Sequence, residues 1–384
     1  IDNLYAVSFT DVNNGTAVGF DGLATGFIIH TSDGGNTWTQ QSSGARNYLT
    51  GVSFTDANTG TVVGYNGTIL RTTNGGTTWT KQASGSTDYL TAVSFTDANN
   101  GTAVGFWNNG VILRTNNGGA TWTRQSSGTV NSLNAVSFTD ANNGTAVGDY
   151  GTILRTSNGG TTWVKQNSGT SESLFGVSFT DANTGTIVGG TSGLILRTID
   201  GGRNWIRQKS EITNQYLFAV SFSDANNGII VGSYGVILRT TNGGTTWTRQ
   251  VSEYTQFLKA VTCVNQNVGI FVGEGGAIFR NSNGMLSYAA DQRKGMPEVF
   301  QLGQNYPNPF NPSTAIMFSI PTRLYVTLKI YDITGRDVAT IVADELSAGT
   351  YSRQWCADGL SSGMYFYRLQ AGSFVETKRL ILLK

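Results

Sequence analysis

The sequence predicts an all-β protein, a seven-bladed β-propeller of four-stranded blades followed by a C-terminal Ig-like β-sandwich. The first observation is a repeat, because six tryptophans stand 41 to 43 residues apart and each closes a copy of one pattern (Trp38, Trp79, Trp122, Trp163, Trp205 and Trp247). A unit of this length holds about four short strands and cannot bury its own apolar side chains, so successive copies must stack as blades. The second observation is that all 5 prolines follow residue 290, where the repeat stops.

The fourth copy shows how the strands of a blade are expected to run. Residues 133–140, 145–148, 152–156 and 161–166 alternate apolar or small residues with polar ones, which is typical of short, half-buried strands. Asn-Gly and Gly-Gly pairs lie between them, and these residues adopt the positive φ that tight hairpins require. Each copy is therefore expected to form one antiparallel blade.

A seventh copy is expected after Trp247, although its sequence diverges. Val261-Thr262-Cys263 stands where other copies have Val-Ser-Phe, Arg280 keeps its place, and Tyr288 occupies the position of the Trp. The propeller is thus predicted to cover residues 1–290, with a linker at 291–303 and a second domain at 304–384. A hydrophobic content of 39% is sufficient for two globular cores.

The second domain carries the most specific motif in the chain. The run Asn-Tyr-Pro-Asn-Pro-Phe-Asn-Pro-Ser-Thr at 305–314, with the segments 326–332 and 360–366, closely resembles the type IX secretion C-terminal sorting domain of type A. Alternating side chains at 327–332, 350–355, 364–369 and 374–382 independently predict the strands of a small sandwich.

This resemblance implies a route of export. Members of the family cross the inner membrane by a signal peptide, which we expect to have been removed ahead of Ile1. The secretion machinery then recognises the sorting domain and passes the protein across the outer membrane. The predicted partner of residues 304–384 is this machinery, and the predicted location is extracellular or the outer-membrane surface of a Gram-negative bacterium.

The blades resemble two groups of propellers. Residues 31–38 are similar to the Asp-box of sialidases, and the repeat Arg-Thr-x-Asn-Gly-Gly-x-x-Trp is similar to the photosystem II assembly-factor propellers. The acid is kept at Asp33 and Asp200, whereas Asn fills this position in the other copies (Asn74, Asn117, Asn158, Asn242 and Asn283). Because an uncharged Asn suffices to cap a turn, we expect this position to be structural.

Composition and charge exclude several classes of function. The 25 basic and 24 acidic residues give a net charge of +1 without a basic run, so nucleic acid is not an expected partner, and no apolar stretch is long enough to span a membrane. No cofactor or metal is predicted, because the Asp-x-Asn-Asn turns at Asp11 and Asp140 lack the further carboxylates of a calcium loop. Cys263 and Cys356 are expected to be buried free thiols.

One face of the propeller is predicted to bind a partner. If the first strand of each blade is innermost, the turns after strands two and four share a face, and on this face the repeat varies while its frame stays fixed. Aromatic rings beside carboxylates and amides suit sugars or peptide segments, although these rings could merely cover the blade tops. The predicted site residues on this face are Tyr65, Phe106, Trp107, Tyr150, Tyr234, Asp21, Asp149 and Glu274.

Catalysis is not expected, and no catalytic residue is assigned. The single His, His30, falls inside a predicted strand, so the sequence has no well-placed His to activate a nucleophile. A carboxylate pair drawn from Asp21, Glu274 and Asp149 leaves a glycan-processing hydrolase as a minor alternative.

A ladder of contacts between blades is a further prediction. Six blades have an Asp at the end of strand one and six have an Arg at the end of strand three, and His30 and Asn265 are the exceptions. Either each Asp meets the Arg of the next blade, or each Asp caps its own turn. The candidate pairs are Asp11 with Arg71, Asp56 with Arg114, Asp97 with Arg155, Asp140 with Arg197, Asp181 with Arg239, and Asp224 with Arg280.

The sequence therefore predicts a secreted, non-catalytic cell-surface propeller that acts as a binding or structural module. In one hypothesis the varied face binds a glycan or a protein partner. In the other, the chain assembles with itself into an extracellular filament or surface layer, with the retained C-terminal domain as the joint.

Overall fold

The computed structural model describes residues 3–21, 25–252, 254–282, 285–291, 299–322, 324–346 and 349–383. The chain divides into two compact units, Ile1–Asp291 and Gln292–Lys384. Most of the predicted linker, residues 292–298, lies outside the described residues. The described part is built from β-strands, and its helical segments are two 3-10 turns, η1 (Ser233–Gly235) and η2 (Glu274–Gly276). None of its helices is of a length and apolarity suited to crossing a membrane.

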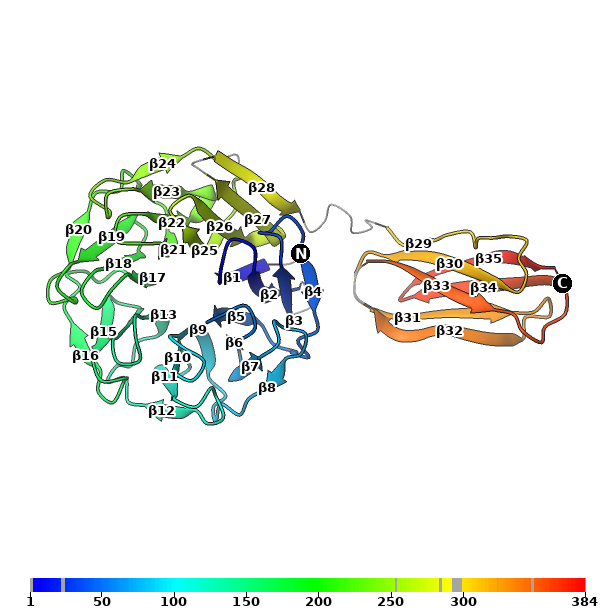
Figure 1. Ribbon diagram of the computed structural model, residues 1–384, viewed down its shortest axis with the longest axis horizontal. Helices are drawn as coiled ribbons and strands as arrows, with labels where there is room; N and C mark the ends of the chain where they lie inside the picture. Colours follow the sequence, from blue (N-terminus) through cyan, green and yellow to red (C-terminus); the bar gives the residue numbers. More distant parts are fainter. Residues whose placement is uncertain are drawn as a thin grey trace. The chain divides into compact units, whose positions relative to one another are not determined.

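The described residues of unit 1 form seven four-stranded sheets arranged in a ring (Figure 1). The sheets are numbered here as blades one to seven in chain order. Blade one contains β1 (Asn3–Phe9), β2 (Gly15–Phe20), β3 (Gly26–Thr31) and β4 (Thr39–Gln41); blade two contains β5 (Leu49–Phe54), β6 (Gly60–Gly64), β7 (Thr68–Thr72) and β8 (Thr80–Lys81); blade three contains β9 (Tyr89–Phe95), β10 (Gly101–Phe106), β11 (Gly110–Thr115) and β12 (Thr123–Gln125).

The other four blades repeat this arrangement. They contain β13 (Leu133–Phe138), β14 (Gly144–Gly148), β15 (Thr152–Thr156) and β16 (Val164–Gln166); β17 (Leu174–Phe179), β18 (Gly185–Gly189), β19 (Leu194–Thr198) and β20 (Ile206–Gln208); β21 (Leu217–Phe222), β22 (Gly228–Gly232), β23 (Ile237–Thr240) and β24 (Thr248–Gln250); and β25 (Leu258–Asn265), β26 (Val268–Gly273), β27 (Ala277–Ser282) and β28 (Met285–Asp291).

Within every blade the strands pair in sequence order and antiparallel, as predicted from the repeat. The first strand of each blade lies innermost in the ring, and the fourth lies outermost (Figure 1). In the fourth copy the first three predicted strands are present, whereas the last begins only at Val164, directly after the repeat tryptophan. The predicted propeller class is confirmed.

The cores of unit 1 lie between blades. Val63 and Ile69 of blade two, for example, pack with Leu90 and Val93 of blade three in one buried cluster. The same kind of cluster closes the ring, because apolar side chains of blade one and blade seven pack together (Leu4, Val7, Ala17, Phe27, Ile29, Ile270, Val272 and Ile278). Each blade therefore depends on both neighbours to bury its two apolar faces.

Hydrogen bonds reinforce these joints between consecutive blades. The hydroxyl of the Ser in strand one accepts a bond from the backbone N–H of the next blade's Phe, as in Phe95 N to Ser53 Oγ at 3.0 Å. A Gln in strand four links two further groups of the next blade, since Gln82 Oε1 accepts from Trp122 Nε1 at 3.2 Å and Gln82 Nε2 donates to Gly118 O at 2.9 Å. The same bond to the preceding blade's Gln is formed by Trp79, Trp163 and Trp205, whereas Trp38 donates to Gly35 O of its own blade.

The repeat arginines also bridge the joints, but not to the predicted aspartates. Arg71 Nη1 donates to Thr61 Oγ1 at 2.6 Å within its blade, and its Nη2 donates to Ala98 O of the next blade at 2.6 Å. The guanidinium lies over the Phe95 ring, 4.7 Å from the centroid. Equivalent bonds to a backbone carbonyl of the next blade are formed by Arg114, Arg155 and Arg239.

The predicted Asp–Arg ladder is therefore wrong, and the alternative, that each Asp caps its own turn, is correct. Asp11 Oδ1 accepts from the backbone N–H groups of Asn13 and Asn14 at 2.7 and 2.9 Å. A carboxylate satisfied by its own turn has no need of a distant guanidinium. No ion pair joins the predicted partners among the described residues, and the same capping recurs at Asp56, Asp97, Asp140, Asp181 and Asp224, and at Asn265.

The turn between strands three and four is capped as expected for both Asp and Asn. Asp33 Oδ1 accepts from Thr37 N at 2.9 Å, and Asn74 Oδ1 accepts from Thr78 N at 3.0 Å in the same geometry. Hydrogen bonds from the Thr37 side chain and backbone lower the pKa of Asp33 to about 2, and bonds from the Asn204 backbone and side chain lower the pKa of Asp200 to about 2.

Unit 2 is a sandwich of two antiparallel sheets. One sheet has the order β29 (Gln301–Leu302), β30 (Ser313–Ile320), β33 (Gly349–Cys356), and the other has the order β32 (Asp337–Leu346), β31 (Leu324–Tyr331), β34 (Gly363–Ala371), β35 (Phe374–Leu382). The four strands predicted here are present, and β29, β30 and β32 were missed. Apolar side chains of both sheets form one core.

The proline-rich motif of unit 2 connects its two ends. Asn305 Nδ2 donates to Pro307 O and to Thr314 Oγ1 at 3.1 and 3.0 Å, which folds the loop on itself. Asn308 Oδ1 accepts from Ile381 N at 2.9 Å, so the loop also fastens the last strand. The buried Tyr367 hydroxyl donates to Gly303 O at 2.7 Å, and burial raises the pKa of Tyr367 to about 12.

We predict that replacing His30 with Arg stabilises the propeller. Thr16 lies opposite position 30, and Phe54 and Ala57 of the next blade are equivalent to the groups that Arg71 contacts. The new guanidinium would bond across the first joint and stack on the ring, which should raise the free energy of unfolding by about 1 kcal/mol. The measurement is chemical denaturation of H30R and of the reciprocal variant R114H, which should lose stability. A lower unfolding midpoint for H30R would contradict the proposed joint.

We also predict a difference in acid sensitivity. The pKa values of Asp33 and Asp200 are lower in the folded state than the unperturbed value of 3.8, so their contribution to stability is complete above this value and is lost as the pH falls from 3.8 toward 2. The double variant D33N/D200N should therefore lose less thermal stability than the wild type between pH 5 and pH 2. N74D adds a third titrating cap and should lose more. If the melting temperatures of all three proteins fall by the same amount between pH 5 and pH 2, the capping carboxylates do not contribute to the acid sensitivity.

Candidate functional site

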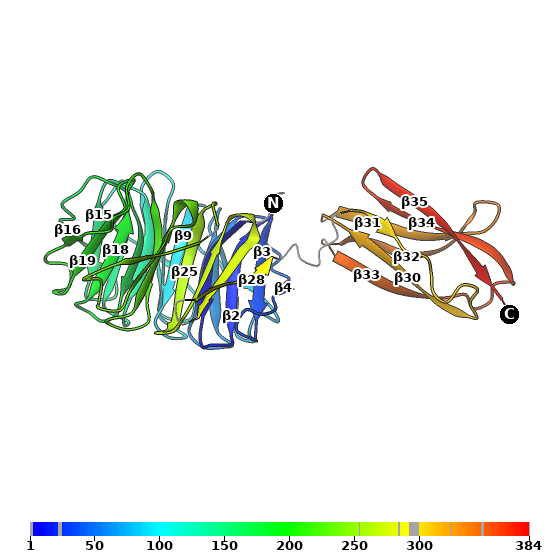
Figure 2. The same cartoon turned by 90° about the horizontal axis from the view of Figure 1, so that it is seen from above.

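The two faces of the propeller ring carry different turns. Strands run from one face to the other (Figure 2), so the turns after strands one and three lie on one face and those after strands two and four on the opposite face. The first face holds the capped turns described above. On the second face, turns approach the start of the innermost strands, as shown by Tyr65 N donating to Tyr48 O at 3.0 Å and Asp149 N donating to Ser132 O at 3.0 Å. We call this second surface the variable face.

A bulge in each innermost strand supplies residues to the variable face. The pairing of β1 with β2 shifts between Leu4 and Ala6, which leaves Tyr5 as the extra residue. A glycine near the end of strand two permits this geometry, because a Cβ at Gly19 would overlap the carbonyl oxygen of Asn3. The equivalent position, next to an invariant Leu, is occupied by a different kind of side chain around the ring (Tyr5, Thr50, Thr91, Asn134, Phe175, Phe218 and Lys259).

Seven aromatic side chains of blades one to three form a continuous first aromatic cluster. Tyr65 and Tyr89 stack at 4.4 Å between ring centroids, and Trp107 meets Tyr89 edge to face at 4.9 Å. Burial raises the pKa of Tyr5 and Tyr65, with smaller effects from neighbouring residues. The cluster consists of Tyr5, Phe20, Tyr48, Tyr65, Tyr89, Phe106 and Trp107.

Trp107 differs from the other tryptophans of the propeller. It is 57% exposed, whereas the six repeat tryptophans are buried or half-buried. Its turn, between β10 and β11, lies outside the repeat frame. An exposed Trp beside a packed aromatic cluster is typical of a binding anchor.

A second aromatic cluster spans blades five to seven and includes a cation. Lys259 Nζ lies 4.6 Å from the centroids of both Phe218 and Phe257, and it pairs with Glu274 Oε1 at 3.4 Å. Tyr234 packs edge to face on Phe257 at 5.5 Å. Phe175, Tyr216, Phe218, Tyr234 and Phe257 form this cluster.

The predicted site residues are thus distributed over the variable face rather than gathered at one point. Phe106, Trp107 and Tyr65 belong to the first cluster and Tyr234 to the second, while Tyr150 is a separate side chain that is 73% exposed. Sequence reasoning missed Tyr5, Phe175, Phe218, Phe257 and Lys259. For four of them the signal was the varying residue inside the Leu-x-Ala/Gly-Val pattern, whereas Phe257 precedes the Leu of its copy. Assigning this segment to a strand does not by itself show on which face the varying residue lies.

The three carboxylates considered for catalysis are each engaged within the protein. Asp21 Oδ1 accepts from Thr25 N at 2.8 Å, Asp149 Oδ1 accepts from Asn134 Nδ2 at 3.0 Å, and Glu274 pairs with Lys259. Among the described residues, no group of three or more His, Cys, Asp or Glu side chains is arranged to hold a metal ion. The variable face therefore combines aromatic surface with carboxylates that are bonded within the protein.

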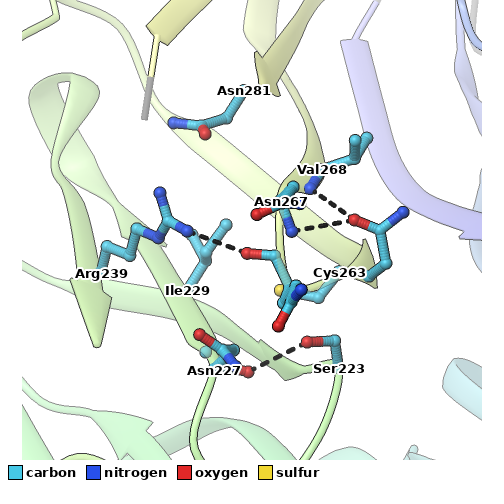
Figure 3. A pocket seen from close by; sticks show the side chains of 11 residues that line it. Ser223, Asn227, Ile229, Arg239, Cys263, Asn267, Val268 and Asn281 are labelled. Atoms are coloured by element: carbon cyan, nitrogen blue, oxygen red, sulfur yellow. Dashed lines mark hydrogen bonds between the residues drawn. The ribbon is translucent and has the colours of Figure 1, made fainter. Parts of the chain in front are cut away.

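A small pocket lies on the opposite face, at the joint between blades six and seven (Figure 3). It lies beside Cys263, which stands where six other blades have Phe and therefore fills less of the joint. Desolvation raises the pKa of the Cys263 thiol to about 12, which disfavours the reactive thiolate. Both cysteines are free, as predicted, but Cys263 is only partly buried and Cys356 is exposed at the end of β33.

Comparisons with known proteins match both units. The family of photosynthesis system II assembly factor YCF48 matches residues 44–130 and 165–305, and the secretion system C-terminal sorting domain matches residues 304–383. No curated protein matches in sequence.

Solved structures of low identity share the fold. A YCF48 bound to a D1 peptide has a TM-score of 0.61 at 21% identity, and covers 73% of this chain and 92% of its own. A GH74 xyloglucanase from Xanthomonas campestris has a TM-score of 0.60 at 12% identity, and covers 91% of this chain and 61% of its own. PorZ of Porphyromonas gingivalis, a surface component of the type IX secretion system, has a TM-score of 0.52 at 13% identity, and covers 98% of this chain and 59% of its own.

Proposed function

This chain belongs to the photosystem II assembly factor YCF48 family and ends in a secretion-system sorting domain, and on that premise we propose that it is a non-catalytic binding module of the cell surface. The sorting domain directs the protein to the cell surface or the extracellular space. The propeller then presents its variable face to a partner, either a glycan chain or a polypeptide segment.

One observation carries this proposal, the exposed Trp107 at the end of the first aromatic cluster. Its indole is fixed by Tyr89 and remains 57% exposed, so it offers apolar area that is already ordered before binding. The blade keeps Trp122 as its repeat tryptophan, and Trp107 is therefore not needed to build the sheet. A YCF48 was solved with a peptide, which supports binding by propellers of this family.

Two alternatives receive less support. The likeness to a xyloglucanase concerns the fold, and the candidate carboxylates Asp21, Asp149 and Glu274 are held by internal hydrogen bonds and an ion pair. Self-assembly into a filament or surface layer would also cover Trp107, with a second copy as the partner. We therefore include the size of the purified protein among the readouts.

We predict that Trp107→Ala weakens binding by about 2 kcal/mol, or roughly 30-fold in Kd, while the melting temperature stays unchanged. The full chain is applied to arrays of oligosaccharides and of peptides, and hits are measured by titration and by the blue shift of Trp107 fluorescence. Light scattering records self-association in parallel.

The matched control is Val12→Ala, because Val12 is a 43% exposed apolar side chain on the opposite face. V12A should bind and assemble as the wild type does. If W107A binds and associates as the wild type does, at the same melting temperature, then the surface around Trp107 does not bind the partner.

A further inference from the structure

Two tyrosines of the variable face occupy a backbone conformation that disfavours them. The first of the two central residues of the tight turn between strands two and three is left-handed in blades two, four, six and seven, with φ of 55° at Asn66, 53° at Tyr150, 52° at Tyr234 and 64° at Gly275. Asn and Gly suit this position, whereas a bulky side chain is strained there. Two blades thus carry Tyr where their sister blades carry residues that fit the turn.

Burial does not compensate for this strain. Tyr150 is 73% exposed and Tyr234 is 58% exposed, so neither ring is covered by the fold. Strained residues that the fold does not require are concentrated at binding sites, where the side chain itself has a use. The two positions therefore point to a ligand.

The segment between the two tyrosines is small and held in place. Blade five lies between blades four and six, and its corresponding turn contains Gly190, Thr191 and Ser192. The Glu172 carboxylate accepts bonds from Thr191 N, Ser192 N and Ser192 Oγ at 3.0, 3.3 and 2.7 Å. Because this turn has small side chains and is held by Glu172, it carries no aromatic ring between the exposed rings of Tyr150 and Tyr234 in the adjacent blades.

Several charged groups of the adjoining blades are hydrogen-bonded or paired within the protein. Asp149, next to Tyr150, accepts from Asn134, and Glu172 is bonded as described and lies 3.9 Å from Arg207. In the second cluster, Lys259 and Glu274 pair with each other. An anionic ligand would find no free cation among these groups, because Arg207 and Lys259 each face a carboxylate. A tyrosine ring with its hydroxyl offers an apolar face and a hydrogen bond, which a neutral sugar ring matches.

We propose that Tyr150 and Tyr234 are ligand-binding residues on which the sugar rings of a neutral glycan chain stack. This inference rests on the proposed function, because it assumes that the variable face is the binding face. It adds the class of ligand and the two residues that select it.

The test replaces each tyrosine with Asn, the residue that fits the turn at Asn66. Y150N and Y234N should melt at a higher temperature than the wild type, because the strain is relieved, and should lose binding by roughly tenfold each. Y150F and Y234F keep the ring and should lose less than either Asn variant. Binding is measured by affinity electrophoresis of the full chain in gels that contain neutral barley β-glucan, mannan or dextran, or charged alginate or polygalacturonate.

Each result decides the proposal. Retardation by a neutral polysaccharide that is lost in the more stable Asn variants supports it. A lower melting temperature in the Asn variants would show that the tyrosines are structural, and no retardation of the wild type by any neutral polysaccharide would overturn the ligand class.

Binding that is lost in W107A but kept in Y150N and Y234N would overturn this inference and leave the proposed function standing. Binding to a peptide instead, lost in the Asn variants, would retain the two residues and reject the glycan.

Discussion

The joint between consecutive blades is the contact on which the rest of the propeller depends. A single four-stranded sheet leaves two apolar faces open, and only a neighbour on each side can cover them. The repeated residues serve this contact directly, since in most copies the Ser, Arg and Gln form hydrogen bonds across a joint, as at Ser53, Arg71 and Gln82. The repeated residues therefore recur at a regular spacing because each copy must form the same joint with its neighbours.

This division of work explains why the variable face can differ from blade to blade. The repeated residues form most of the contacts across the joints, whereas the bulge residue beside the invariant Leu and the residues of the turn after strand two differ between blades. Three of the bulge residues, Thr50, Thr91 and Asn134, also donate a hydrogen bond to a carbonyl of the next blade. Tyr5, Thr50, Asn134 and Lys259 occupy the same structural position with four different chemistries. The ring thus presents a single surface composed of seven independently variable patches.

The fold was predictable from sequence because its signals are local and repeated. The period, the Asn-Gly turns and the alternation within strands each indicated the same four-stranded unit, and the aromatic turns were assigned to one face from strand order. The bulge was not predictable, because an extra residue such as Phe218 reads as an ordinary strand position. The Asp–Arg pairing failed for a physical reason, since two backbone N–H groups lie within the same turn as Asp11 and satisfy its carboxylate before any distant partner can.

The closure of the ring has a topological consequence. Every sheet of the propeller is built from strands that are consecutive in the chain. Among the described residues, blades one and seven meet through side-chain packing, the Arg280 bond to Gly34 and the Asn3 bond to Gly275, with no strand shared between the two ends. A circular permutant that opens at any connection between blades would preserve all of these sheets. The sorting domain, unit 2, could then follow any chosen blade, so that the same propeller would be attached through a different blade.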